Sequence, residues 1–218
     1  MRLDGPLWLA SRSPRRRQLL ESARLNVRVR RPEIDDGRLR CDRVPPEHWV
    51  VGMALLKATN VADLLAGPRP GATGIVLGAD TVCVHRRRVL GQPTDADHAR
   101  AMLRGLRDAD HEVVTGVCLI DLSGGDRSVF FDRAMVRVGH LGDDEIDRYV
   151  ESGSWRGKAG GYNLAERIEA GWPLHCDGDP ATVMGLPMRR LLRWFAVNVP
   201  TEQVAPEVNS GGGGEGGS

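Results

Sequence analysis

Residues 75–90 have the sequence IVLGADTVCVHRRRVL, and this stretch decides the predicted fold. Its first five residues are apolar and mostly branched or small, and the run is short enough to be a buried strand. Asp80 follows directly, so we expect its carboxylate at the carboxyl end of that strand. Residues 82–89 place the charged HRRR between apolar flanks, which predicts a hairpin with a solvated tip.

Helices are expected both before and after this strand in the sequence. Ser13 is a good N-cap and Pro14 suits the first helical position, so a helix is predicted from Pro14 to about Ala23. Residues 46–65 have apolar side chains at helical spacing and include Lys57. A start that resembles a capping box opens a third helix over about 94–106.

The remaining predicted elements are strands over 27–29, 112–121 and 128–139, and helices over about 143–152 and 187–197. Strands mixed with helices, together with a long hairpin, predict an α/β fold with a mixed twisted sheet and flanking helices. Ligands usually bind at the polar and glycine-rich loops of such folds.

The composition is that of a folded globular protein. Of 218 residues, 41% are hydrophobic and 27% are charged. We expect a single domain over residues 1–199 and a disordered glycine-rich tail over 200–218. Lys plus Arg total 30 and Asp plus Glu total 29, so the balance of charge gives no indication of a nucleic acid polymer as partner.

The cysteines are widely spaced and form no CxxC pair; they are Cys41, Cys83, Cys118 and Cys176. This spacing favours reduced thiols and a cytoplasmic location. No stretch approaches the roughly 18 apolar residues that a bilayer crossing needs. We therefore expect a soluble protein with no membrane partner.

Residues 9–16, LASRSPRR, predict a phosphate site. Hydroxyls, backbone N–H groups and guanidinium groups surround a helix start, where the partial positive charge favours anions. Ser11, Arg15 and Arg16 are the main candidates, and the N-cap Ser13 belongs to the same turn. The alternative is an exposed basic turn without a ligand.

Two acidic positions are candidates for catalysis or metal binding. Asp80 is placed where a catalytic base or a magnesium ligand is typically mounted, although a carboxylate there is often only a cap. Glu33 opens the segment EIDD, which ends at Asp36 and offers three carboxylates for a metal. An acidic solvated loop explains EIDD about equally well.

Residues 157–162, GKAGGY, combine a lysine with small residues that allow a backbone to approach a ligand closely. Lys158 and Lys57 are the two lysines of the chain. Taken alone, this segment is equally a flexible loop. His111 precedes a strand, where a histidine is more often packed than catalytic.

In this order, the segments resemble the Maf family of nucleotide pyrophosphatases across about residues 7–195. The matching pieces are LASRSPRRRQLL, EIDD, ALLKA, GADTV, LGQP, ARAMLRGL, HEVVTGV, GKAGGYNL and GDPATVMGLPM. The resemblance implies an elongated two-lobed structure with a central cleft, often dimeric. It also implies hydrolysis of a nucleoside triphosphate between the α- and β-phosphates, with Mg²⁺ or Mn²⁺ as the divalent metal.

The resemblance also implies roles for the candidate residues. Ser11, Arg15 and Arg16 would bind phosphates, and Lys57 and Lys158 would neutralise charge. Asp80 would be the general base or a carboxylate linked to the metal. Thr81 would lie near the pocket for the base, a position that favours the pyrimidine type.

Two positions depart from the family pattern. Gln92, in LGQP, stands where a lysine is usual, which removes one cation from the cleft. Ala165 stands where members acting on thymidine and uridine triphosphates have a glutamine that binds the base. The preferred base is thus open between these pyrimidines, 7-methylguanosine and another modified base.

The same two departures support a rival hypothesis, a Maf-like nucleotide sensor or division regulator with little hydrolysis. A third hypothesis is an arginine-rich RNA-binding protein. The near-neutral charge and the few aromatic residues disfavour this third hypothesis.

Overall fold

The computed structural model describes residues 5–35, 39, 44–67 and 71–199. The predictions for Asp36, Cys41 and the tail over 200–218 lie outside these ranges. The strands are β1 (Leu7–Ala10), β2 (Val27–Val29), β3 (Ile75–His85), β4 (Arg88–Leu90), β5 (Ala109–Asp121), β6 (Arg127–Val138) and β7 (Leu174–Asp177). The α-helices are α1 (Pro14–Ser22), α2 (Pro46–Ala66), α3 (Ala96–Leu106), α4 (Asp143–Glu151), α5 (Leu164–Glu169), α6 (Pro180–Val183) and α7 (Met188–Asn198), and η2 (Ala159–Gly161) is a 3₁₀ turn.

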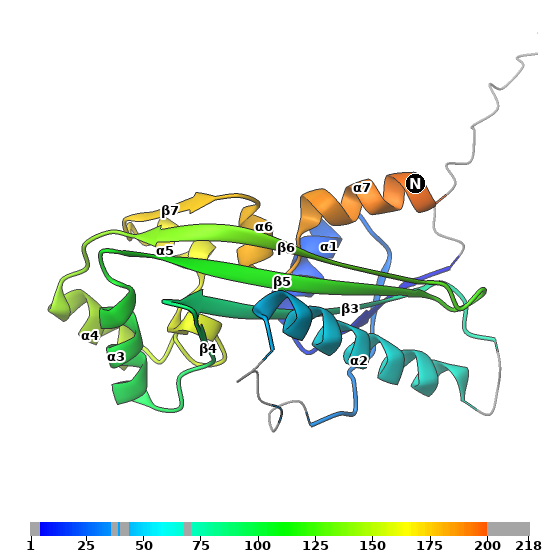
Figure 1. The fold of residues 1–218 in the computed structure, drawn as a ribbon, viewed down its shortest axis with the longest axis horizontal. Helices are drawn as coiled ribbons and strands as arrows, with labels where there is room; N and C mark the ends of the chain where they lie inside the picture. Colours follow the sequence, from blue (N-terminus) through cyan, green and yellow to red (C-terminus); the bar gives the residue numbers. More distant parts are fainter. Residues whose placement is uncertain (1–4, 36–38, 40–43, 68–70, 200–218) are drawn as a thin grey trace, which may run out of the picture.

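The described strands form one mixed, seven-stranded sheet, which confirms the predicted fold class (Figure 1). Their order is β2-β1-β3-β5-β6-β7, with β4 paired to the end of β3. Strand β1 is parallel to β2 and β3, whereas β3, β5 and β6 are long antiparallel neighbours. These three long strands run through the whole elongated molecule and connect its two ends.

The position of Asp80 differs from the prediction, because it lies in the middle of β3 and not at its end. Strand β5 pairs with β3 from Ile75 to Val84, so the ladder continues past the carboxylate. On its other edge, β3 pairs with the much shorter strand β1. The register pairs Ala10, the last residue of β1, with Gly78. Asp80 therefore lies just beyond the point where β1 ends and the turn into α1 begins.

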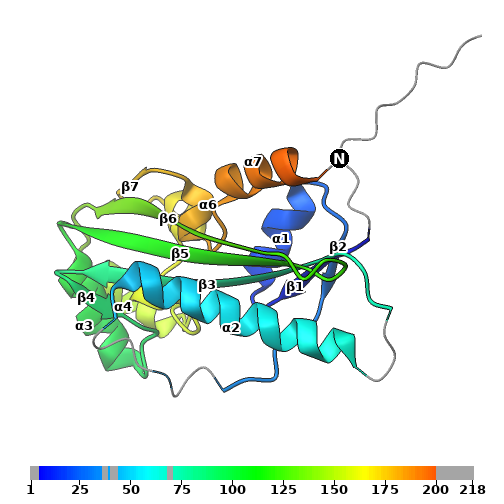
Figure 2. The ribbon, with the colours of Figure 1, turned by 45° about the vertical axis from the view of Figure 1, so that its right-hand side comes forward.

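Helix α2 covers one face of the sheet, and α1 and α7 cover the other (Figures 1 and 2). Gly78 and Gly116 allow α2 to approach closely. A Cβ atom at Gly78 would lie 2.2 Å from the Ala54 carbonyl oxygen, and one at Gly116 would lie 2.4 Å from the Val50 carbonyl carbon. The absence of a side chain at both glycines thus fixes how far α2 lies from β3 and β5.

Helix α2 has 21 residues and a mean hydropathy of 1.3 in its most apolar window, so by length and composition alone it qualifies to cross a membrane. This differs from the sequence expectation that no stretch comes near that limit. One face of α2 packs on the sheet through Val50, Ala54 and Ala58, all with no exposed surface. Packing in the core explains this apolar composition.

The core has its largest clusters at the two ends of the sheet. One joins β1 and α1 to α7 through Leu9, Leu20 and Phe195. The other joins α3 and α4 to β7 around Leu103 and Trp172. The strand β7 and the helices α5 and α6 were not predicted, because elements of four to six residues show little periodicity.

Candidate active site

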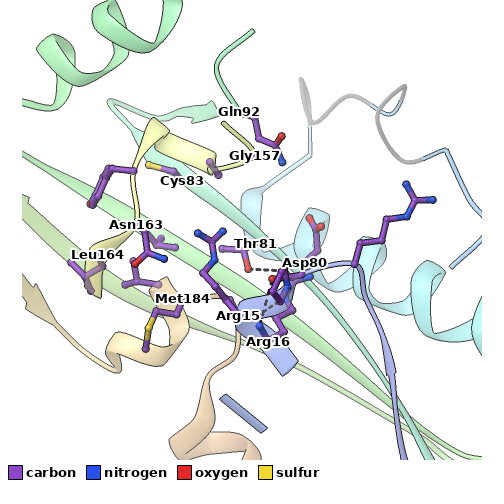
Figure 3. A pocket seen from close by; sticks show the side chains of 18 of the residues that line it. Arg15, Arg16, Asp80, Thr81, Cys83, Gln92, Gly157, Asn163, Leu164 and Met184 are labelled. Atoms are coloured by element: carbon purple, nitrogen blue, oxygen red, sulfur yellow. Dashed lines mark hydrogen bonds between the residues drawn. The ribbon is translucent and has the colours of Figure 1, made fainter. Parts of the chain in front are cut away.

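A cavity of about 390 Å³ opens beside β3, at the place where β1 ends (Figure 3). Segments from distant parts of the sequence line it. They are the start of α1, one residue of α2, the middle of β3, the loop between β4 and α3, the start of β5, the segment from the loop after α4 to the start of α5, and the turn after α6. The predicted residues Ser13, Arg15, Arg16, Lys57, Asp80, Thr81 and Gln92 all lie on its wall.

One side of the cavity is cationic. Arg15 extends from the start of α1 into the space (Figure 3), and no hydrogen bond to another described residue holds its guanidinium group. Arg12 and Lys57 lie on the same wall, and Asp80 is the sole carboxylate that lines it among residues 5–35, 44–67 and 71–199. The excess of positive charge suits a polyanion such as a chain of phosphates.

Arg16 holds three parts of the wall together. Its Nε donates to the carbonyl oxygen of Gly185 at 2.9 Å, Nη1 donates to the Ser11 hydroxyl at 3.3 Å, and Nη2 donates to the Thr81 hydroxyl at 3.1 Å. The bonds connect α1 to β3 and to the turn between α6 and α7. The sequence prediction grouped Arg16 with Arg15 as a phosphate ligand, whereas the structure shows three of its N–H groups bonded within the wall.

Asp80 and Lys57 form an ion pair between β3 and α2. The Lys57 Nζ lies 2.7 Å from Asp80 Oδ1, and the two side chains are 11% and 17% exposed, respectively. The other carboxylate oxygen of Asp80 accepts no hydrogen bond from the described part of the chain. Lys57 therefore orients the carboxylate and leaves its second oxygen available to a water molecule or a metal ion.

Thr81 uses its hydroxyl group within the protein. Thr115 donates its single hydroxyl hydrogen to the Thr182 carbonyl oxygen at 2.8 Å, and its oxygen lies 2.9 Å from that of Thr81. Thr81 must therefore donate to Thr115 while it accepts from Arg16. Its hydroxyl hydrogen is committed, although the side chain lines the cavity.

The opposite side of the cavity is more apolar. Cys83, Val113, Leu164, Val183 and Met184 line it. Burial raises the pKa of the Cys83 thiol to about 12, so this cysteine stays protonated and acts as a small apolar group. The free cysteines expected from the sequence are found at the described positions 83, 118 and 176.

His111 and Tyr162 lie at this end as a bonded pair. His111 is 2% exposed and its Nε2 lies 2.8 Å from the Tyr162 hydroxyl oxygen. Burial, together with the nearby His85, lowers the pKa of His111 to about 4. From the sequence, His111 was expected to be packed and not catalytic, and Asn163 was not predicted as a site residue. The signal for Asn163 was present, because Asn followed three residues later by Glu is a helix start.

Several predicted site residues lie elsewhere. Ser11 lines a smaller cavity of about 140 Å³, next to the first. Lys158 does not line either cavity, because its ammonium group pairs with the carboxylate of Glu166. Ala165 is exposed and also lies outside both cavities.

The two predicted metal-binding residues are not brought together. Glu33 is 61% exposed, pairs with Arg30 at 2.9 Å and lines neither cavity. Within the described ranges, no three His, Cys, Asp or Glu side chains converge as a metal cluster. A single carboxylate fits the way in which Mg²⁺ is usually bound, through one or two carboxylates and the phosphates of a substrate.

The chain matches a known protein family. A model of Maf-like proteins matches residues 6–197. The chain belongs to the Maf family. The family match confirms the resemblance found in the sequence over about residues 7–195. The match covers nearly all of the described structure.

Close relatives of this Maf protein have a name in common. Proteins named dTTP/UTP pyrophosphatase share 40% identity over 193 residues in Salinibacter ruber and 38% over 199 residues in Moorella thermoacetica. Both alignments cover 88% of this chain, with 91% and 96% of the relatives. A third, from Bacillus cereus, is 36% identical over 85% of this chain and 91% of its own length.

Proposed function

We propose that this Maf protein is a nucleoside triphosphate pyrophosphatase, which releases a nucleoside monophosphate and pyrophosphate. The observation that carries the proposal is one cavity that holds both a cationic wall and the carboxylate of Asp80. The names of the three relatives support the same reaction type and suggest a pyrimidine triphosphate as substrate. The expected homodimer stays a prediction.

The roles follow from the chemistry of the groups. Arg15 and Arg12 bind the phosphates, since guanidinium groups form charge-assisted bonds with phosphate oxygens. Asp80, oriented by Lys57, positions a water molecule and accepts its proton as the water attacks phosphorus. A divalent metal held by Asp80 and the phosphates would supply neutralisation of the charge on the phosphate oxygens.

The deciding experiment is pyrophosphate release from a panel of normal, methylated and deaminated nucleoside triphosphates, each with Mg²⁺ or Mn²⁺. We expect metal-dependent release of one pyrophosphate per monophosphate. Saturable binding of a triphosphate with no product from any panel member would instead support the sensor. Release of orthophosphate as the first product would contradict attack between the α- and β-phosphates.

A further inference from the structure

Thr115, in the middle of β5, is a buried polar residue behind the wall of the larger cavity. It has no exposed surface and lines neither of the two cavities described above. Its hydroxyl group nevertheless connects two segments that line the larger one. It donates to the carbonyl oxygen of Thr182 in α6 and contacts the hydroxyl oxygen of Thr81 on β3. Thr115 therefore links β3 to α6 through β5.

These bonds continue into Arg16 and return to the turn after α6. Thr81 accepts from Arg16 Nη2 at 3.1 Å, and Arg16 Nε donates to the Gly185 carbonyl oxygen at 2.9 Å. Gly185 follows Thr182 by three residues, so the path of contacts closes on itself. We call this closed set the Thr115 network; its members are Arg16, Thr81, Thr115 and residues 182–185.

The direction of each side-chain bond in the network is fixed. A carbonyl oxygen only accepts, so Thr115 must use its one hydroxyl hydrogen on Thr182. Thr81 then donates to Thr115, while it accepts from Arg16, whose guanidinium group only donates. Removal of the Thr115 hydroxyl group would leave the Thr81 hydrogen without this acceptor and would release α6 from β5.

Helix α6 depends on such contacts because it has only four residues. An isolated helix of fewer than about 12 residues is at best marginally stable in water. The Thr182 hydroxyl donates to the Asp132 carboxylate on β6 at 2.8 Å, which fixes α6 from a second side. Gly185 has a φ of +110°, and a Cβ atom there would lie 3.1 Å from Arg16 Nε. Glycine thus lets the turn approach the guanidinium group closely.

The network connects three walls of the cavity. On α1, Arg15 directly precedes Arg16, and on β3, Asp80 directly precedes Thr81 (Figure 3). The turn after α6 adds Met184 to the lining. The proposed reaction needs a phosphate at Arg15 to be aligned with a water molecule at Asp80. A misplacement of ~1 Å at such a site reduces a rate by about 100-fold.

We propose that Thr115 is a positioning residue of this site, because its hydroxyl group holds α1, β3 and the turn after α6 in the arrangement that aligns the phosphate with Asp80. The inference rests on the proposed function, since the aligned groups belong to the same cavity. It assigns this role to a residue that does not touch the substrate. Thr81 then acts by holding Arg16 and not as a donor to the base.

Two pairs of variants remove the hydroxyl group in two different shapes. Thr115→Val keeps the shape of threonine, and Thr115→Ala differs from Thr115→Ser by the hydroxyl group alone. Values of kcat/KM for pyrophosphate release from UTP are measured per binding site. The sites are counted by calorimetry with α,β-methylene UTP, so that unfolded molecules do not contribute.

The hydroxyl group should decide the result in both pairs. We expect a fall of at least ~10-fold from wild type to Thr115→Val, and from Thr115→Ser to Thr115→Ala. Thr115→Ser should retain most of the wild-type value, because it keeps both hydrogen bonds. A fall in neither pair would overturn the proposal. A loss in Thr115→Ser as large as in Thr115→Val would assign the effect to packing and would also overturn it.

Leu119→Ala controls for a general loss of stability. Leu119 is 1% exposed on the same strand, lines neither cavity and packs in the core cluster of α1 and α7. This change should lower the free energy of unfolding, while kcat/KM per binding site stays near the wild-type value. Equal losses of kcat/KM in Leu119→Ala and Thr115→Val would mean that destabilisation causes both, which contradicts the proposal.

A double-mutant cycle tests the network itself. Thr81→Val opens the same closed path at the neighbouring bond. The double variant with Thr81→Val and Thr115→Val should therefore lose no more kcat/KM than the worse of the two single variants. Independent residues would instead give losses that multiply. Such multiplication would show that Thr115 does not act through Thr81.

Binding separates this proposal from the proposed function. The affinity for α,β-methylene UTP, which requires no hydrolysis, is measured for the four proteins of the cycle. Non-additive losses of affinity in a protein that hydrolyses nothing would support the network and reject the pyrophosphatase. Hydrolysis by the wild-type protein with multiplied losses in the cycle would reject Thr115 as a positioning residue and leave the pyrophosphatase intact. Unchanged affinities in a protein without hydrolysis would overturn both.

Discussion

Arg15 and Arg16 are adjacent in the sequence but have different surroundings. Neighbouring residues on a helix point about 100° apart, so one guanidinium group faces the cavity and the other faces Gly185, Ser11 and Thr81. Sequence alone assigned both to phosphate, because it shows residue type and not direction. The contacts within the wall distinguish them.

Arg15→Ala tests this difference. Loss of a charge-assisted hydrogen bond to phosphate costs roughly 1.5–3 kcal/mol, so kcat/KM for a triphosphate should fall about 10- to 100-fold. Arg17→Ala on the same helix is the matched control, since the Arg17 side chain is 59% exposed and its one ion pair within the described residues is with Glu21. Equal effects of the two changes would place the phosphates away from Arg15.

Asp80→Asn keeps the shape of the carboxylate and removes its basicity. A general base contributes about 10²- to 10⁴-fold to a rate, so kcat should fall at least ~100-fold while nucleotide binding is retained. Titration calorimetry and pyrophosphate release measure the two effects separately. Asp126→Asn, in the exposed turn between β5 and β6, controls for the loss of a charge. Near wild-type release by Asp80→Asn would show that Asp80 is not the base.

Burial of His111 should make stability depend on pH. Its pKa is lowered from 6.5 to about 4, so the unfolded chain binds this proton more tightly than the folded protein does. The free energy of unfolding therefore falls as pH decreases through 6.5 toward 4, by at most about 1.4 kcal/mol per pH unit, and this group has no effect well above pH 6.5.

Urea unfolding at pH 7 and pH 5 measures this effect. We expect a smaller difference between the two pH values in His111→Gln, because glutamine does not titrate. Each variant serves as its own reference, so a general loss of stability does not disturb the comparison. The same pH dependence in both proteins would mean that other groups cause it.

The longer elements follow local rules that a sequence shows. Ser13 and Asp95 cap α1 and α3 through their side chains, as their residue types indicate. The full length of β3 was not predicted, because Asp80 interrupts the apolar run that indicated a strand. Pairing with β5, which comes later in the chain, carries β3 past the carboxylate. Such long-range pairing leaves no local signal.

The fit of α2 against the sheet depends on glycine at the element scale. Gly116→Ala would place a Cβ atom 2.4–2.6 Å from the backbone of Val50 and Val51, which forces α2 away from β5. Such overpacking lowers the free energy of unfolding by roughly 1–3 kcal/mol. The shift of α2 would also move Lys57 relative to Asp80. We expect both a lower free energy of unfolding and a lower kcat.

A second glycine provides the control. Gly52 lies exposed on α2, and no atom of the residues that the structure describes lies within 4 Å of an added Cβ atom. Gly52→Ala should raise the free energy of unfolding by about 0.5–1 kcal/mol, because alanine favours the helix. Chemical denaturation of both variants checks the pair. A stable, active Gly116→Ala protein would show that α2 tolerates a greater distance from the sheet.

At the scale of the whole molecule, the cavity depends on contacts between distant parts of the chain. The motifs in the sequence named Arg15, Lys57 and Asp80, each in a recognisable segment, and all three line one cavity. The motifs also named Lys158 and Glu33, which line neither cavity and form ion pairs with Glu166 and Arg30. Ion pairs of this kind require the folded structure.

The elongated shape raises the question of whether the two ends unfold together. Strands β5 and β6 contribute to both large core clusters, through Leu119 and Phe130 at one end and Val113 and Val136 at the other. Neither end can lose its core without breaking strands that the other end needs. We therefore expect a single cooperative transition, as a single domain over residues 1–199 requires.

Two single-tryptophan variants test this expectation. One retains Trp194, which packs against the cluster of α1 and α7, and the other retains Trp172 in the cluster of α3 and α4. In urea, the fluorescence midpoint of each should coincide with the midpoint of its own far-ultraviolet circular dichroism, because both clusters share the long strands. A Trp172 signal that changes before the dichroism would show that the end with α3 and α4 unfolds independently, and the chain would then have two folding units.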